Sequence, residues 1–243
     1  MTHVTACIDG SASAPAVCDY AAWASQRLVG LGSREHLLDE LASQDEKRGK
    51  PALEQGRIML AAAKERAMAE GVSSPETKQR HGDLLESLRE LESDIRLLVI
   101  GRQGESSGGA EAHVGSQLES VIRIMHRPVL VTPARFKKPE SAMLAFDGGA
   151  TTRKGVEMLA ASPLLKGLPI HLVMVGTETK EGWAQLDAAC STLSTGGYKV
   201  HTAMRAGEVE PTLHAYQKEH GIDLLVMGAY GHSRIRHYGQ RIR

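Results

Sequence analysis

The sequence has no excess of either charge and few cysteines. Its 243 residues include 29 basic and 29 acidic side chains, so the formal net charge is zero. Nucleic-acid-binding proteins normally carry a basic excess or stripe, so we expect no nucleic-acid partner. The three cysteines, Cys7, Cys18 and Cys190, form no Cys-x-x-Cys pair. The odd number argues against a disulfide framework or a zinc site and favours a reducing compartment.

Segments for export or membrane insertion are also lacking. The first residues show no basic region followed by an apolar core, as a signal peptide would. No apolar run approaches the ~18 residues that span a bilayer. Hydrophobic residues make up 42% of the chain and charged residues 24%, which is ordinary for a folded globular protein. We therefore expect a soluble, cytoplasmic protein without a membrane partner.

Several well-known catalytic and nucleotide motifs are absent. The sequence contains no Gly-x-x-x-x-Gly-Lys-Ser/Thr loop, no Gly-x-Gly-x-x-Gly run and no Gly-x-Ser-x-Gly elbow. A Walker A site, a Rossmann dinucleotide site and a serine hydrolase are therefore not expected. The histidine pairs 232/237 and 214/220 lack the i, i+4 spacing of a zinc-binding helix, so we expect no metal site. No group suggests itself as a general base, and we do not expect an enzyme.

What the sequence does contain is an alternation of short apolar runs and longer helical stretches. The runs are strand candidates and lie at 4–8, 96–100, 129–131, 142–146, 170–175 and 224–227. Between them, as at 116–125, apolar residues recur at i, i+3, i+4 and i+7, which is the spacing of a helix with one buried face. This order predicts an α/β fold with parallel sheets covered by helices.

Three segments recur in the same order in the two halves of the chain. Residues 7–12 resemble 145–150, residues 81–83 resemble 206–208, and residues 97–104 resemble 224–231. The pattern is interrupted near 133–141 by Pro133, Pro139 and the basic cluster at 135–138. We therefore predict a tandem duplication with domains at 1–135 and 141–243.

The stretch from 97 to 131 is typical of a phosphate site. An apolar strand runs into Gly101-x-x-Gly104, and Gly115-Ser116 opens a helix. Glycines let the backbone approach a ligand closely, and a helix N-terminus offers free N–H groups to an anion. An alternative without a ligand is also open, because Ser116 and Glu119 form a helix capping box.

In each half of the chain, one aspartate follows the predicted first strand. Asp9 precedes Gly10 and Ser11, and Asp147 holds the matching position in the second half. Ligands of parallel sheets bind at the carboxyl ends of the strands, where a carboxylate can accept hydrogen bonds from a ribose or an adenine amine. The alternative is that each aspartate only caps the next helix.

These motifs together resemble the universal stress protein family, and the two-copy layout is similar to its tandem members. The resemblance rests on the Asp-Gly-Ser after the first strand, the glycine loop, the strand at 128–131 and the Met-Gly-Ala-Tyr-Gly-His-Ser run at 227–233. It implies doubly wound five-stranded parallel sheets and ATP as ligand, with AMP or ADP as alternatives and Mg²⁺ as a counter-ion. The implied ATP-binding residues are Asp9, Gly10, Ser11, Ile100, Gly101, Arg102, Gly104, Gly115 and Ser116, with Asp147, Met227, Gly228 and Gly231 in the second copy.

The sequence departs from the family pattern at two places. The family expects a second strand after the helix at about 15–28, whereas residues 34–48 read as a charged helix, so the second strand is predicted to be missing. The second half ends at Arg243 without a Gly-Ser, a following helix or a final strand. We therefore predict an incomplete second copy and an incomplete second phosphate site.

Three functions are compatible with these observations. The preferred one is an adenine-nucleotide-binding protein with a regulatory role in stress response, in which the nucleotide orders the loop at 104–115 and biases contacts with a homodimer or protein partner. The second is an interaction protein of the same fold that binds no nucleotide. The third is a slow ATP hydrolase.

Overall fold

The chain forms two compact units that divide between Lys138 and Pro139. The structure is a computed structural model and describes residues 3–28, 36–42, 49–102 and 116–228. Each unit has its own parallel sheet with helices on both faces, so the predicted tandem α/β fold is confirmed. None of the helices in these ranges is long and apolar enough to cross a bilayer.

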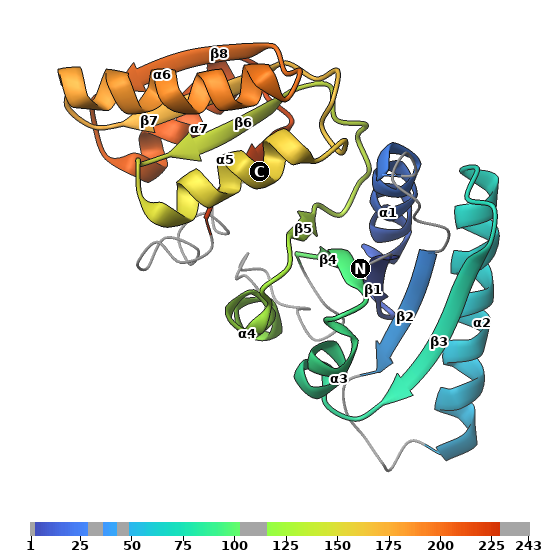
Figure 1. The fold of residues 1–243 in the computed structure, drawn as a ribbon. Helices are drawn as coiled ribbons and strands as arrows, with labels where there is room; N and C mark the ends of the chain where they lie inside the picture. The colour runs from blue at the N-terminus through green and yellow to red at the C-terminus, as the bar shows by residue number, and fades with distance from the viewer. Residues whose placement is uncertain (1–2, 29–35, 43–48, 103–115, 229–243) are drawn as a thin grey trace. The chain divides into compact units, whose positions relative to one another are not determined.

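The first unit contains five parallel strands in the order β3-β2-β1-β4-β5. Helices alternate with the strands along the chain, as Figure 1 shows. The elements are β1 (His3–Ile8), α1 (Ala14–Leu28), β2 (His36–Ala42), α2 (Gly49–Ala69), β3 (Pro75–His81), α3 (Leu84–Leu91), β4 (Ile95–Gly101), α4 (Ser116–Ile124) and β5 (Val129–Thr132).

The two faces of this sheet are covered by different helices. Alternate side chains of a strand point to opposite faces. Cys7, Leu98 and Ile100 accordingly pack with Leu88 of α3 and Val121 of α4 in one buried core. Helices α1 and α2 contact each other and the strands, and they form the other layer (Figure 1). The chain thus changes direction across the sheet between β1 and β4, which makes this pair the topological switch point.

The second unit repeats this arrangement with four described strands in the order β8-β7-β6-β9. Its sheet is parallel throughout, and β6, β7, β8 and β9 occupy the positions of β1, β2, β3 and β4. Its elements are β6 (Ala142–Phe146), α5 (Ala150–Ala161), β7 (Ile170–Val175), α6 (Lys180–Thr195), β8 (Val200–Arg205), α7 (Val209–Glu219) and β9 (Leu224–Val226). The predicted incomplete second copy corresponds to these four strands, and residues 229–243 lie outside the described part.

A glycine at the same place in each unit marks the duplication in the backbone. Gly82 has a φ of 116° and Gly207 a φ of 130°, and each immediately precedes the N-cap of a helix, α3 or α7. A side chain is strained at such angles, so glycine is required at both turns. In the first copy the cap is Asp83, whose carboxylate accepts from the N–H groups of Leu85 and Glu86.

The prediction that the second strand is missing is wrong. Residues 36–42 form β2, which pairs in parallel with β1 on one side and β3 on the other. Residues 36–42 therefore do not belong to the predicted charged helix, the rest of 34–48 lies outside the described residues, and α2 begins at Gly49. The physical reason is that two neighbouring strands offer β2 a full set of backbone partners, and such tertiary pairing outweighs the weak strand preference of Asp39 and Glu40.

Candidate functional site

The candidate site lies at the carboxyl edge of the first sheet, at the switch point between β1 and β4. Cys7 of β1 lies opposite Ile100 of β4 in the register of the two strands. Asp9, just after the end of β1, therefore lies at the same edge of the sheet as Gly101, the last residue of β4, and Arg102. The edge continues to β5, because the backbone N–H of Arg102 donates to the carbonyl of Thr132 at 3.0 Å.

Asp9 shapes the turn that leaves β1. Its Oδ1 accepts a hydrogen bond from the backbone N–H of Ser11 at 3.1 Å, and the hydroxyls of Ser11 and Ser13 lie 2.7 Å apart. Gly10 is exposed and Ser11 is half-buried, so the turn is reachable from solvent. This bond closes the turn three residues before α1 begins at Ala14, so it is not a cap of that helix. It does not exclude a ligand, because a carboxylate has about four lone-pair positions for hydrogen bonds.

The matching turn of the second unit is centred on Asp147, whose carboxylate accepts two hydrogen bonds. Asp147 Oδ1 accepts from the N–H of Gly149 at 2.9 Å and from the hydroxyl of Thr152 at 2.7 Å. The side chain of Gln185 from α6 lies over Gly148, where an added Cβ would fall 1.7 Å from Gln185 Oε1. Asp147 and Gln185 are nevertheless exposed, so this turn is also reachable from solvent.

The end of β9 packs closely against the start of α5. Gly228 lies against the start of α5, because a Cβ added there would come within 3.0 Å of Thr151 Cγ2. Sequence reasoning did not single out Thr151, Thr152 or Gln185. Thr152 lies five residues after Asp147, on the first turn of the helix, and this spacing is the signal that could have revealed it.

The structure brings only part of the predicted phosphate site together. Ile100 is buried, and Gly101 and Arg102 are half-buried at the end of β4. Ser116 is the first residue of α4, where the predicted helix begins. Gly104, Gly115 and Gly231 lie outside the described residues.

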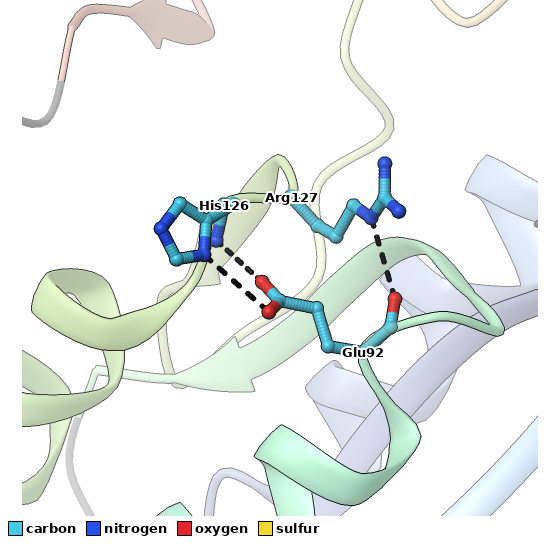
Figure 2. A network of polar contacts seen from close by, with 3 residues as sticks. All are labelled: Glu92, His126 and Arg127. Carbon is cyan, nitrogen blue, oxygen red and sulfur yellow. Dashed lines mark hydrogen bonds and ion pairs between the residues drawn. The ribbon is translucent and has the colours of Figure 1, made fainter.

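Helix α4 is fastened at its C-terminal end by Glu92, the residue that ends α3. The Glu92 carboxylate accepts from the backbone N–H of His126 at 2.5 Å and lies 3.4 Å from His126 Nδ1. The carbonyl of Glu92 accepts from Arg127 Nε at 3.3 Å, so the three residues form the network shown in Figure 2. This network holds the C-terminal end of α4, and the candidate phosphate site lies at the other end of the helix.

The charges near the start of α4 are balanced within the helix. Glu119, in the first turn, would disfavour an anion at the helix N-terminus. Its carboxylate is paired with Arg123, one turn further along, at 2.7 Å. The pair reduces the repulsion that a phosphate would meet there.

Two hollows on the described surface are lined by other residues. An open depression of about 460 Å³ is lined by Thr179, Trp183 and their neighbours on α6, and a hollow of about 50 Å³ by Thr5 and residues from β3, α3 and β4. Neither is lined by Asp9 or Asp147. Within the described ranges no group of three His, Cys, Asp or Glu side chains could hold a metal ion.

The duplicated parallel sheets define a tandem doubly wound α/β protein, and comparison with known proteins gives the family. A sequence profile of the universal stress protein family matches residues 1–133. The universal stress protein Slr1230 of Synechocystis sp. is 32% identical over 265 aligned positions, which cover 98% of this chain and 92% of the relative. The chain belongs to the universal stress protein family.

One solved structure agrees with this fold over nearly the whole chain. The crystal structure of a universal stress protein from Archaeoglobus fulgidus superposes with a TM-score of 0.78 at 16% identity, covering 98% of this chain and 95% of that one. A universal stress protein of the same organism in complex with dAMP covers 54% of this chain and 96% of its own, at 20% identity and a TM-score of 0.40.

Proposed function

We propose that the protein is an adenine-nucleotide-binding member of its family with a regulatory role in stress response. The nucleotide, with ATP as the preferred form and ADP or AMP as alternatives, occupies the carboxyl edge of the first sheet. The observation that carries this proposal is the juxtaposition of the Asp9 turn with the end of β4 at the switch point. In doubly wound sheets this is where ligands bind.

The residues of this edge suit the parts of a nucleotide. Asp9 accepts hydrogen bonds from ribose hydroxyls or an adenine amine, and Gly10 and Ser11 shape its turn. Ile100, Gly101 and Arg102 line the end of β4, and Arg102 supplies a cation beside the phosphates. Gly104, Gly115 and Ser116 direct N–H groups and the positive end of α4 at the phosphate tail, for which Mg²⁺ would serve as counter-ion.

The second unit contributes less to nucleotide binding in this proposal. Asp147, Met227, Gly228 and Gly231 are the corresponding residues, and the Asp147 carboxylate already accepts a hydrogen bond from Thr152 within its own unit. This bond favours the alternative function for the second unit alone, namely protein interaction without a nucleotide. Nothing in the described residues favours ATP hydrolysis, which the same experiment tests.

The test is a calorimetric titration of the full chain with ATP, ADP and AMP, with and without Mg²⁺. Gly115→Val is expected to abolish binding, because a branched side chain blocks the approach of the phosphate. Gly155→Val is the matched control, since a Cβ at Gly155 meets nothing within 4 Å. At a hundredfold excess over the Kd, ATP should stabilise the wild type by about 2.7 kcal/mol.

Three results would contradict the proposal. The absence of both heat and stabilisation with wild-type protein would favour the interaction protein. Unchanged affinity in Gly115→Val would remove the phosphate loop from the assignment. Steady phosphate release above the level of Gly115→Val would favour the hydrolase.

A further inference from the structure

Three histidines meet on the face of the second sheet that α7 covers. His171 of β7 and His201 of β8 are directly opposite in the strand register, and their ring centroids are 5.1 Å apart. His220, which ends α7, has its ring centroid 5.2 Å from that of His171. These three residues are called the histidine cluster below.

Tyr216 joins the histidine cluster to the core. Its side chain is 4% exposed and packs with Met143 and Val173 beneath α7. Its hydroxyl lies 3.0 Å from His171 Nδ1, and its ring centroid is 4.2 Å from that of His220. The histidine cluster therefore connects the C-terminal end of α7 to β7 and β8.

The charges around the histidine cluster are unbalanced once the rings are protonated. Strand β8 contributes Arg205, whose guanidinium carbon lies 5.2 Å from the Tyr216 ring centre, and β6 contributes the uncharged Met143. Helix α7 contributes Tyr216 and one carboxylate, Glu219, which lies 3.7 Å from His220 Nε2. Among the described contacts, three imidazolium ions and Arg205 would thus face one carboxylate, Glu219, with His201 and His220 exposed to solvent.

The titration of His171 follows the same imbalance. Burial lowers the pKa of His171 below its ordinary value, and the neighbouring His201 and His220 lower it further. The unfolded chain then takes up the proton more readily than the folded one. The neutral His171 ring therefore contributes fully to the free energy of unfolding above the ordinary histidine pKa of about 6.5, and this contribution is lost as the pH falls below it.

We propose that the histidine cluster is an acid-sensitive latch, whose neutral rings hold the end of α7 against β7 and β8 and whose joint protonation releases it. The release reaches further along the chain, because α7 leads through Gly221–Asp223 directly into β9. The end of β9 carries Met227 and Gly228, so acidification loosens the carboxyl edge of the second sheet. The latch does not depend on nucleotide binding in the first unit.

The first unit provides an internal reference. If Gly82 and Gly207 are matched, Leu91 of α3 takes the place of Tyr216. Leu91 lines the hollow of about 50 Å³ together with His3, Thr5 and Asp94, so one histidine lines this hollow in place of a group of three. Helix α3 should therefore respond to acid far less than α7.

Amide hydrogen exchange of the full chain tests the latch. Between about pH 7.5 and about pH 5.5, after correction for intrinsic rates, α7 should lose more protection than α3, because protonation of the histidine cluster opposes the folded state only in the second unit. The double variant His201→Gln/His220→Gln keeps His171 and Tyr216 but removes two charges, and α7 should then lose no more protection than α3. His126→Gln in the first unit is the control and should behave as the wild type.

A second measurement follows His171 directly. The ring proton signals of His171 in the wild-type protein should titrate below the ordinary value of about pH 6.5 and shift upward in the double variant. Equal loss of protection in α3 and α7, an unchanged response of the double variant, or a His171 midpoint at or above the ordinary value would each overturn the proposal.

Discussion

The backbone N–H of His126 donates a hydrogen bond to the carboxylate of Glu92, 34 residues earlier in the chain. The bond joins the end of α3 to the end of α4. Since α4 begins at Ser116, this bond also constrains the direction of the α4 axis, and with it the direction of the helix N-terminus at the candidate site. Glu92 therefore supports the site without belonging to it.

Removal of this carboxylate should weaken the first unit. Glu92→Ala leaves the N–H of His126 without its side-chain acceptor, and we expect a loss of about 1 kcal/mol in the free energy of unfolding. Urea denaturation measures it. His126→Gln keeps the backbone bond and alters only a side chain that is 78% exposed, so it should change stability by less than about 0.5 kcal/mol. Equal losses in both variants would contradict the role of the backbone bond.

The two aspartate turns should differ in their effect on nucleotide affinity. Asp9→Asn removes the negative acceptor for ribose or adenine, and we expect the affinity for ATP to fall about tenfold, in line with a hydrogen bond to a charged group. Asp147→Asn is the matched control in the second turn, where the carboxylate accepts from Thr152, and it should leave the affinity unchanged. Calorimetry of both variants decides, and a larger effect of Asp147→Asn would assign the site to the second unit.

The ion pair between α1 and α2 should stabilise the first unit. Asp19, with a side chain 9% exposed, accepts two hydrogen bonds from Arg66, at 2.5 Å from Nε and 2.8 Å from a terminal nitrogen. Arg66→Ala would leave a buried carboxylate unpaired, at a cost of about 2 kcal/mol. Arg57→Ala on the same helix breaks an exposed pair with Glu54 and should cost under about 0.5 kcal/mol. Similar melting temperatures for the two variants would refute the difference.

The cysteines should react at very different rates. Burial, together with the neighbouring Asp19, raises the pKa of Cys18 from 9.0 to about 11. A thiol reagent near neutral pH should therefore label the partly exposed Cys190 and spare Cys18 until the protein unfolds. The unfolded chain loses the Cys18 proton first, so stability should also decline as the pH rises above 9.0. Fast labelling of Cys18 in the folded protein would contradict its burial.

The parts of the fold that sequence reasoning predicted are those with apolar runs. Strands β1 and β4 lie in the interior of the sheet, and their near-continuous hydrophobic residues identify them. Strand β3 was not predicted, because it is an edge strand whose sequence, Pro-Glu-Thr-Lys-Gln-Arg-His, contains no apolar alternation. Strand β8, at the edge of the second sheet, was not predicted for a similar reason.

The candidate site was predictable where it depends on local sequence. Asp-Gly after an apolar strand indicated both aspartate turns, and their backbone hydrogen bonds to Ser11 and Gly149 follow from two-residue spacing. The approach of Gln185 to Gly148 joins residues 37 positions apart and depends on how α6 packs. Such contacts arise from tertiary structure and leave no motif in the sequence.

Each of the two described sheets draws its strand ladder from its own half of the chain. A substitution that spoils the ligand edge of one copy therefore leaves the backbone pairing of the other untouched. Selection can consequently retain a binding role in one copy while the other drifts toward a different task. The different neighbours of the two aspartate turns, Ser11 at Asp9 and Thr152 at Asp147, are what such divergence after duplication would produce.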